Sequence, residues 1–166
     1  MSEWIAIFTI TCLVIITIQD FKERAVSWFL FPCGFLLCGI QSWVQIGWKD
    51  LLLNLGINLF LLLILVLMLL LYLLFRFGIR RLKFWDFLGA GDVLFLVVLA
   101  SCFSPFNFII FTIASLLLAL LTSLIFLSGR TIPLAGIQAV CLSCFITLQC
   151  FIGLKPFNDN WIFLWM

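Results

Sequence analysis

The chain has 166 residues, of which 66% are hydrophobic and 10% are charged, and its mean hydropathy is +1.36. Water-soluble domains do not have this composition, so we predict an integral membrane protein. The formal net charge is +2 and the sequence contains no patterned basic stripe, which argues against a nucleic-acid partner. A chain of this length holds about six or seven spans of ~20 residues, which leaves room for a single transmembrane domain, 1–166.

Apolar runs, separated by charged or helix-breaking residues, predict six transmembrane helices. In chain order they cover about 4–19, 27–46, 51–75, 87–103, 106–127 and 133–153. The first run follows Met1-Ser2-Glu3, which lacks the positive charge of a secretory signal, so it is predicted to be retained. The expected fold class is all-α: a polytopic membrane protein built as a bundle of six transmembrane helices in the lipid bilayer.

The lysines and arginines are unevenly distributed among the predicted loops, and positively charged loops remain in the cytoplasm. If both termini lie outside, seven of the nine basic residues lie in cytoplasmic loops, against Lys49 and Lys155 outside. In this orientation the first span reaches the cytoplasmic face with Asp20, and the fourth span leaves that face with Asp92. The two carboxyl groups are therefore predicted at a similar depth.

Asp20 and Asp92 are the candidate catalytic residues. Ionisable groups in or beside membrane spans are costly, and they therefore suggest function. Two carboxyl groups within a few ångströms cannot easily both ionise, so one retains a proton and the pair supplies an acid and a base. The chain has no histidine, which removes Ser-His and Cys-His dyads and His-carboxylate metal sites. We expect aspartyl chemistry on a water molecule, with no metal and no cofactor.

Two glycines, Gly89 and Gly91, stand directly before Asp92. Because they lack Cβ atoms, they would let an extended substrate or the first span approach the backbone at Asp92. Ordinary helix packing by small residues is the alternative, and the glycines alone would favour it. Gln138, five residues after Pro133, is predicted at roughly the depth of the aspartates, where it could contact them.

Other polar residues fit structural roles. Asn54 and Asn58, four residues apart in the third span, are predicted to make interhelical hydrogen bonds rather than to bind a ligand. The seven cysteines fall inside or beside apolar runs. Cys141 and Cys144 form one C-x-x-C pair without a second pair, so core packing is favoured over zinc binding or redox chemistry.

Three motifs occur in a fixed order along the chain. They are Asp20 followed by Phe21-Lys22-Glu23-Arg24-Ala25-Val26-Ser27, then Gly89-Ala90-Gly91-Asp92-Val93, then Ile132-Pro133-Leu134-Ala135-Gly136. With six predicted spans, this pattern resembles the type IV prepilin peptidases, a family of membrane GxGD aspartyl proteases. The resemblance implies that Asp20 and Asp92 are the catalytic pair and that Gly89 and Gly91 shape the site. It also implies a prepilin-like or signal-peptide-bearing protein substrate, cut at the cytoplasmic face of the bacterial inner membrane.

The chain also departs from the family pattern. Larger members carry a domain with paired C-x-x-C motifs and methylate the new N-terminus, and nothing in this sequence corresponds to that domain. We therefore predict a peptidase without methyltransferase activity. Two non-enzymatic functions stay open: a proton-coupled transporter, although no internal repeat is evident, and an inactive relative that acts as an assembly factor. The oligomeric state does not follow from the sequence.

Overall fold

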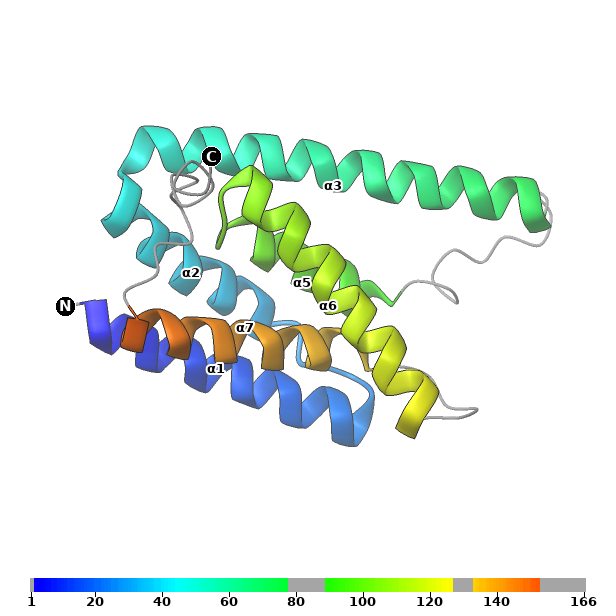
Figure 1. Ribbon diagram of the computed structural model, residues 1–166, viewed down its shortest axis with the longest axis horizontal. Helices are drawn as coiled ribbons and strands as arrows, with labels where there is room; N and C mark the ends of the chain where they lie inside the picture. The colour runs from blue at the N-terminus through cyan, green and yellow to red at the C-terminus, as the bar shows by residue number, and fades with distance from the viewer. Residues whose placement is uncertain (1, 78–88, 127–132, 153–166) are drawn as a thin grey trace.

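The computed structural model describes residues 2–77, 89–126 and 133–152, and these residues form six α-helices (Figure 1). The helices are α1 (Ser2–Glu23), α2 (Leu30–Ile46), α3 (Trp48–Phe77), α5 (Ala90–Ala100), α6 (Pro105–Phe126) and α7 (Leu134–Ile152). Each end lies within about one helical turn of the predicted span. The all-α prediction is confirmed for the part of the chain that is described.

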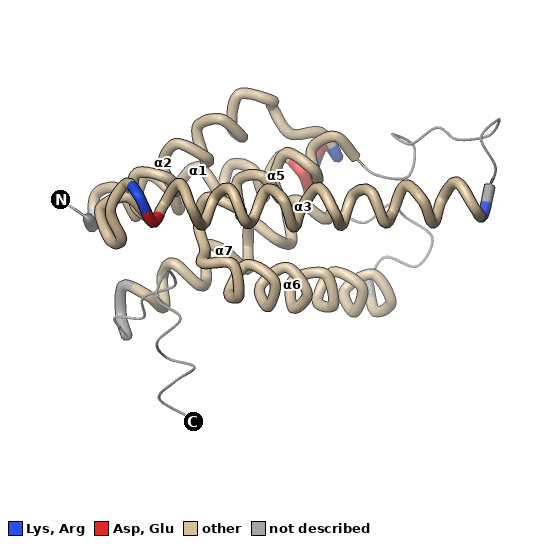
Figure 2. The backbone as a smooth tube through the Cα atoms, turned by 90° about the horizontal axis from the view of Figure 1, so that it is seen from above, with Lys and Arg blue, Asp and Glu red and all other residues tan. Residues whose placement is uncertain are grey.

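Three of the described helices are long and apolar enough to cross a membrane, over Trp4–Glu23, Trp48–Arg76 and Pro105–Ile125. Many large hydrophobic side chains on these helices are exposed, as expected for lipid-facing surfaces. The charged residues of the described chain lie near helix ends (Figure 2). These features support a membrane protein.

The other three helices, α2, α5 and α7, are apolar but shorter. The shortest is α5, whose 11 residues extend only about 16 Å. This length is well below the ~30 Å hydrocarbon core of a bilayer. The described part of the fourth predicted span ends at Ala100, three residues earlier than predicted, because a turn begins at Ser101.

The helices are arranged so that three of their ends meet. In Figure 1, α1 and α7 lie side by side, α3 runs along the opposite side, and α2, α5 and α6 lie between them. The most deeply buried apolar side chains include Leu13, Ile16, Phe95, Leu99 and Leu142. In this arrangement the end of α1 lies near the beginnings of α5 and α7, at one end of the bundle.

The turn that joins α5 to α6 is buried along its whole length, residues 101–104. Non-helical backbone within a membrane must be covered by protein and hydrogen-bonded. Asn58 of α3 donates from Nδ2 to the carbonyl oxygens of Ala100 and Phe103, at 2.9 and 2.8 Å. Ser42 of α2 donates to the carbonyl of Ser101 at 2.6 Å. The interhelical hydrogen bonding predicted for Asn58 is confirmed.

Replacing Asn58 with leucine is expected to lower the free energy of unfolding by about 2 kcal/mol, because two buried carbonyl groups lose their donor. Chemical unfolding of the purified protein in detergent micelles measures this change. Asn54→Leu, one turn earlier on the same helix at a half-buried position, is the matched control and should change stability far less. Equal effects of the two substitutions would show that the Asn58 side chain does not hold the turn.

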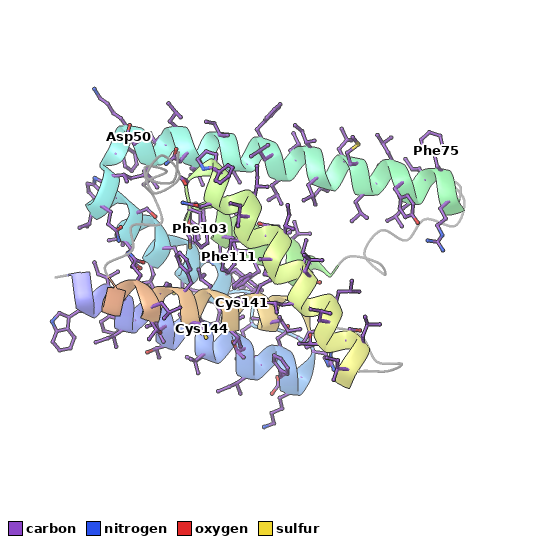
Figure 3. The ribbon with its side chains drawn as sticks, viewed as in Figure 1. Asp50, Phe75, Phe103, Phe111, Cys141 and Cys144 are labelled. Carbon is purple, nitrogen blue, oxygen red and sulfur yellow. The ribbon has the colours of Figure 1, made fainter. Side chains whose placement is uncertain are left out.

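Aromatic side chains pack the same turn against α6 and α7. The ring of Phe103 stacks on Phe111 with 4.8 Å between centroids and meets Phe145 edge-on at 5.3 Å. Figure 3 shows Phe103 and Phe111 close together inside the bundle, whereas Phe75 lies at the far end of α3. The turn is thus held by polar contacts on one side and by aromatic contacts on the other.

Candidate active site

Asp20 lies in the last turn of α1, which continues to Glu23 instead of ending near Gln19 as predicted. The side chain is only 8% exposed. Its Oδ2 atom accepts a hydrogen bond of 2.5 Å from the backbone N–H of Gly136, at the beginning of α7. A carboxyl group in the interior of an apolar bundle needs such a donor.

Asp92 is the third residue of α5, after the N-cap residue Gly89. Its half-buried side chain accepts a hydrogen bond at Oδ1 from the backbone N–H of Ala135, at 3.1 Å. The carboxyl group also lies against the N-cap, where the backbone N–H of Gly89 interacts with it. An acidic residue at this helical position commonly reaches back to the N-cap N–H in this way.

The two aspartates meet at the first turn of α7. This helix follows Pro133, which has no side-chain oxygen to cap it, so the N–H groups of Ala135 and Gly136 need other acceptors. Asp92 and Asp20, from two other helices, supply them. Because adjacent backbone nitrogens are only three bonds apart, the two bonded oxygens lie within about 10 Å of each other. The carboxyl groups are close enough to interact electrostatically.

The beginning of α7 offsets part of the cost of placing negative charge on this pair. The N-terminal end of α7 carries the positive end of its helix dipole and presents N–H groups to both carboxyl groups. Each carboxyl group binds α7 through one oxygen, and its second oxygen can hold a proton or bind a water molecule. The arrangement is chemically suited to passing a proton between two acids and a water molecule.

Little room is left for a side chain at Gly136, where α1 approaches α7. A Cβ atom at Gly136 would lie 3.0 Å from Asp20 Oδ2 and 3.0 Å from two ring carbons of Phe21. A Cβ atom at Gly89 would lie 2.9 Å from Asp92 Oδ2, whereas one at Gly91 would make an ordinary contact with a ring at 3.5 Å. The close approach of the Asp20 helix, which we predicted at Gly89 and Gly91, is therefore made at Gly136.

Gln138 lies on α7, three residues after Ala135, and its side chain is completely buried. Its Nε2 atom donates to Ser115 Oγ of α6 at 3.4 Å. The amide is thus directed at α6 rather than at a carboxyl group. The predicted contact with the aspartates is not made.

The remaining candidate ligands do not gather into a metal site. Within residues 2–77, 89–126 and 133–152, no three His, Cys, Asp or Glu side chains are placed to hold an ion. Cys141 and Cys144 are free thiols on α7, the first half-buried and the second exposed, and Figure 3 shows both along this helix. Their positions agree with packing in an apolar environment.

The backbone donors of Ala135 and Gly136 are the site groups that reasoning from side chains missed. A signal was present in Pro133-Leu134-Ala135-Gly136, since a helix that begins after proline with no Ser, Thr, Asp or Asn must find its cap elsewhere. Comparisons of the chain with family models, with curated proteins and with solved structures found no match.

Proposed function

We propose that the chain is a membrane aspartic endopeptidase that removes the leader peptide from prepilin-like proteins at the cytoplasmic face of the bacterial inner membrane. One observation carries the proposal: the carboxyl groups of Asp20 and Asp92, from helices α1 and α5, hydrogen-bond consecutive N–H groups of α7. A buried carboxyl group and a half-buried one at the same helix end are costly in an apolar bundle. A proton-transfer function accounts for that cost.

In the proposed reaction, one aspartate is ionised and the other is protonated. The ionised carboxylate takes a proton from a water molecule as the water oxygen attacks the peptide carbonyl carbon. The protonated partner hydrogen-bonds the carbonyl oxygen and stabilises the negative charge that develops there. As the C–N bond breaks, the amine leaves with a proton from the pair. The pair is then ready for another water molecule, and no side-chain nucleophile is needed.

The membrane arrangement that we propose is six crossing helices with both termini outside. It is supported by the three helices of spanning length and by the meeting of α1, α5 and α7 at one end of the bundle. Lys22, in the last turn of α1, and Arg24, directly after α1, lie close in sequence to Asp20 at this end of the bundle. Positive residues mark the cytoplasmic side of a membrane protein. The pair would then act at the inner face.

Cysteine labelling in intact cells tests this orientation. Lys49 and Ser27 are exposed and stand at opposite ends of α2. A membrane-impermeant maleimide is expected to label Lys49→Cys in intact spheroplasts, and Ser27→Cys only after lysis. The unmodified chain measures the background from its own cysteines. The reverse labelling pattern would contradict the proposed orientation.

A cleavage assay tests the activity. Purified protein in lipid vesicles is incubated with a peptide that joins a charged leader to an apolar segment of about 20 residues, long enough to span the bilayer. Mass spectrometry is expected to show one cut at the junction, and a matched peptide without the leader should remain intact. If the wild-type protein leaves a panel of prepilin-like peptides uncut, the proposed activity is wrong.

A further inference from the structure

A polar cluster lies between α6 and α7 in the otherwise apolar interior. It consists of Thr112, Ser115 and Gln138, whose exposed fractions are 4%, 1% and 0%. The Ser115 hydroxyl donates to the backbone carbonyl of Thr112 at 3.0 Å, and Gln138 Nε2 donates to Ser115 Oγ at 3.4 Å. Thr112 and Ser115 are three residues apart, so they share a face of α6.

Two atoms of this cluster have no hydrogen-bond partner among the described residues: Thr112 Oγ1 and Gln138 Oε1. Turning the Gln138 amide over would bring its oxygen to Ser115 and leave its NH₂ group unpaired instead, so one end lacks a partner in either orientation. Buried polar groups without partners are rare, because burial removes the hydrogen bonds that they make in water. The cluster therefore requires a further partner.

Other threonines show that the state of Thr112 is unusual. Threonine hydroxyls within helices commonly turn back to a carbonyl of the preceding turn. Thr9, Thr11, Thr17, Thr122 and Thr147 all do so, with distances between 2.7 and 2.9 Å. Thr112 is the only threonine in the described part of the chain that does not.

We propose that Thr112 Oγ1 and Gln138 Oε1 bind an internal water molecule between α6 and α7. Internal water commonly bonds to two to four otherwise unpaired polar groups, and Ser115 Oγ, which contacts both the Thr112 backbone and the Gln138 amide, is a neighbouring third partner. We favour water over an ion, since the cluster contains no charged side chain to balance the charge of a buried ion.

The position of the water site gives it a second role, which rests on the proposed peptidase function. Gln138 follows Ala135 by three residues, which is about 4.5 Å along the axis of α7, and Ala135 donates to the carboxyl group of Asp92. Gln138 thus stands about one helical turn along α7 from the residue that anchors Asp92. Hydrolysis consumes one water molecule in each cycle, and this site supplies it from within the bundle.

The substitution Thr112→Val tests hydration independently of any activity, because valine has nearly the same shape and lacks the hydroxyl. If the hydroxyl binds water, the substitution removes a hydrogen bond and lowers the melting temperature in micelles by about 3 °C. If the site is dry, the substitution removes an unpaired polar atom and the melting temperature stays the same or rises. Thr112→Ser should keep the water. A high-resolution map with density within hydrogen-bond distance of both oxygens is expected, and an empty map would overturn the proposal.

Kinetics of peptide cleavage then test the supply of water. Thr112→Val is expected to lower kcat severalfold with KM unchanged, because water and not the peptide is affected. Thr9→Val, at another fully buried position, is the matched control and should leave kcat unchanged. If density and melting data show the water but kcat is unaltered, the supply role is wrong. If the wild-type protein cleaves no peptide, the proposed function fails, while the hydration result stands on its own.

Discussion

Replacing Asp92 with asparagine is expected to reduce peptide cleavage by roughly 10³-fold, because general acid–base catalysis contributes about 10² to 10⁴. Asparagine keeps a side-chain oxygen that can accept the hydrogen bond from Ala135, but it cannot take up or release a proton. Asp20→Asn should have the same effect through its bond to Gly136. Initial rates of peptide cleavage in lipid vesicles measure both changes.

The same substitutions separate catalysis from helix capping. If the aspartates only cap α7, the asparagine variants lose little, because asparagine is as good a capping residue as aspartate. Both variants are expected to keep a melting temperature close to that of the wild-type protein, whereas Asp20→Ala, which loses the acceptor, should melt lower. Asp50→Asn, at an exposed position at the start of α3, is the matched control. Cleavage that survives in either Asp20→Asn or Asp92→Asn would exclude the two-carboxyl mechanism.

The second large effect is expected at Gly136, where Gly136→Ala should lower the cleavage rate by about 10-fold, since its contacts require a shift of a few tenths of an ångström and a misplacement of 1 Å can cost about 10²-fold. The new Cβ atom would lie 3.0 Å from Asp20 Oδ2 and from two carbons of the Phe21 ring. Phe21 is half-exposed and can rotate, but Asp20 must move away from its backbone donor. The measurement is again the initial rate.

Stability distinguishes this local shift from unfolding. Alanine is a better helix former than glycine by about 1 kcal/mol, which offsets part of the strain at the beginning of α7. The melting temperature of Gly136→Ala is therefore expected to change little while its activity falls. Gly39→Ala, where a Cβ atom would have no neighbour within 4 Å, is the control and should retain full activity. Full activity in Gly136→Ala would show that the position of Asp20 against α7 is unimportant for cleavage.

The helices were largely predictable because long apolar runs in this chain have few competing structures. The position at which α5 ends was not predictable from the sequence. Cys102 and Phe103 extend the apolar run beyond Ala100, and hydropathy alone therefore predicts a longer helix. The turn forms there because Asn58 and Ser42, on α3 and α2, bind its carbonyl groups. Such long-range hydrogen bonds cannot be inferred from the local sequence.

The candidate site was predictable in part for a related reason. Charge distribution and helix direction indicated that Asp20 and Asp92 lie at the same end of the bundle, and both side chains are found at the beginning of α7. Their partners are backbone N–H groups, which every residue but proline possesses, so no residue type marks them. The depth of Gln138 followed from its distance to Pro133, but its direction toward Ser115 depends on where α6 packs.

The side chains of Asp20 and Asp92 are both hydrogen-bonded to adjacent peptide units of one helix, α7, so their positions are not independent. A displacement of α7 along its axis by one residue, about 1.5 Å, would break or exchange both anchoring bonds at once. Any displacement of α7 along its axis therefore moves the anchoring donors of the two acids together.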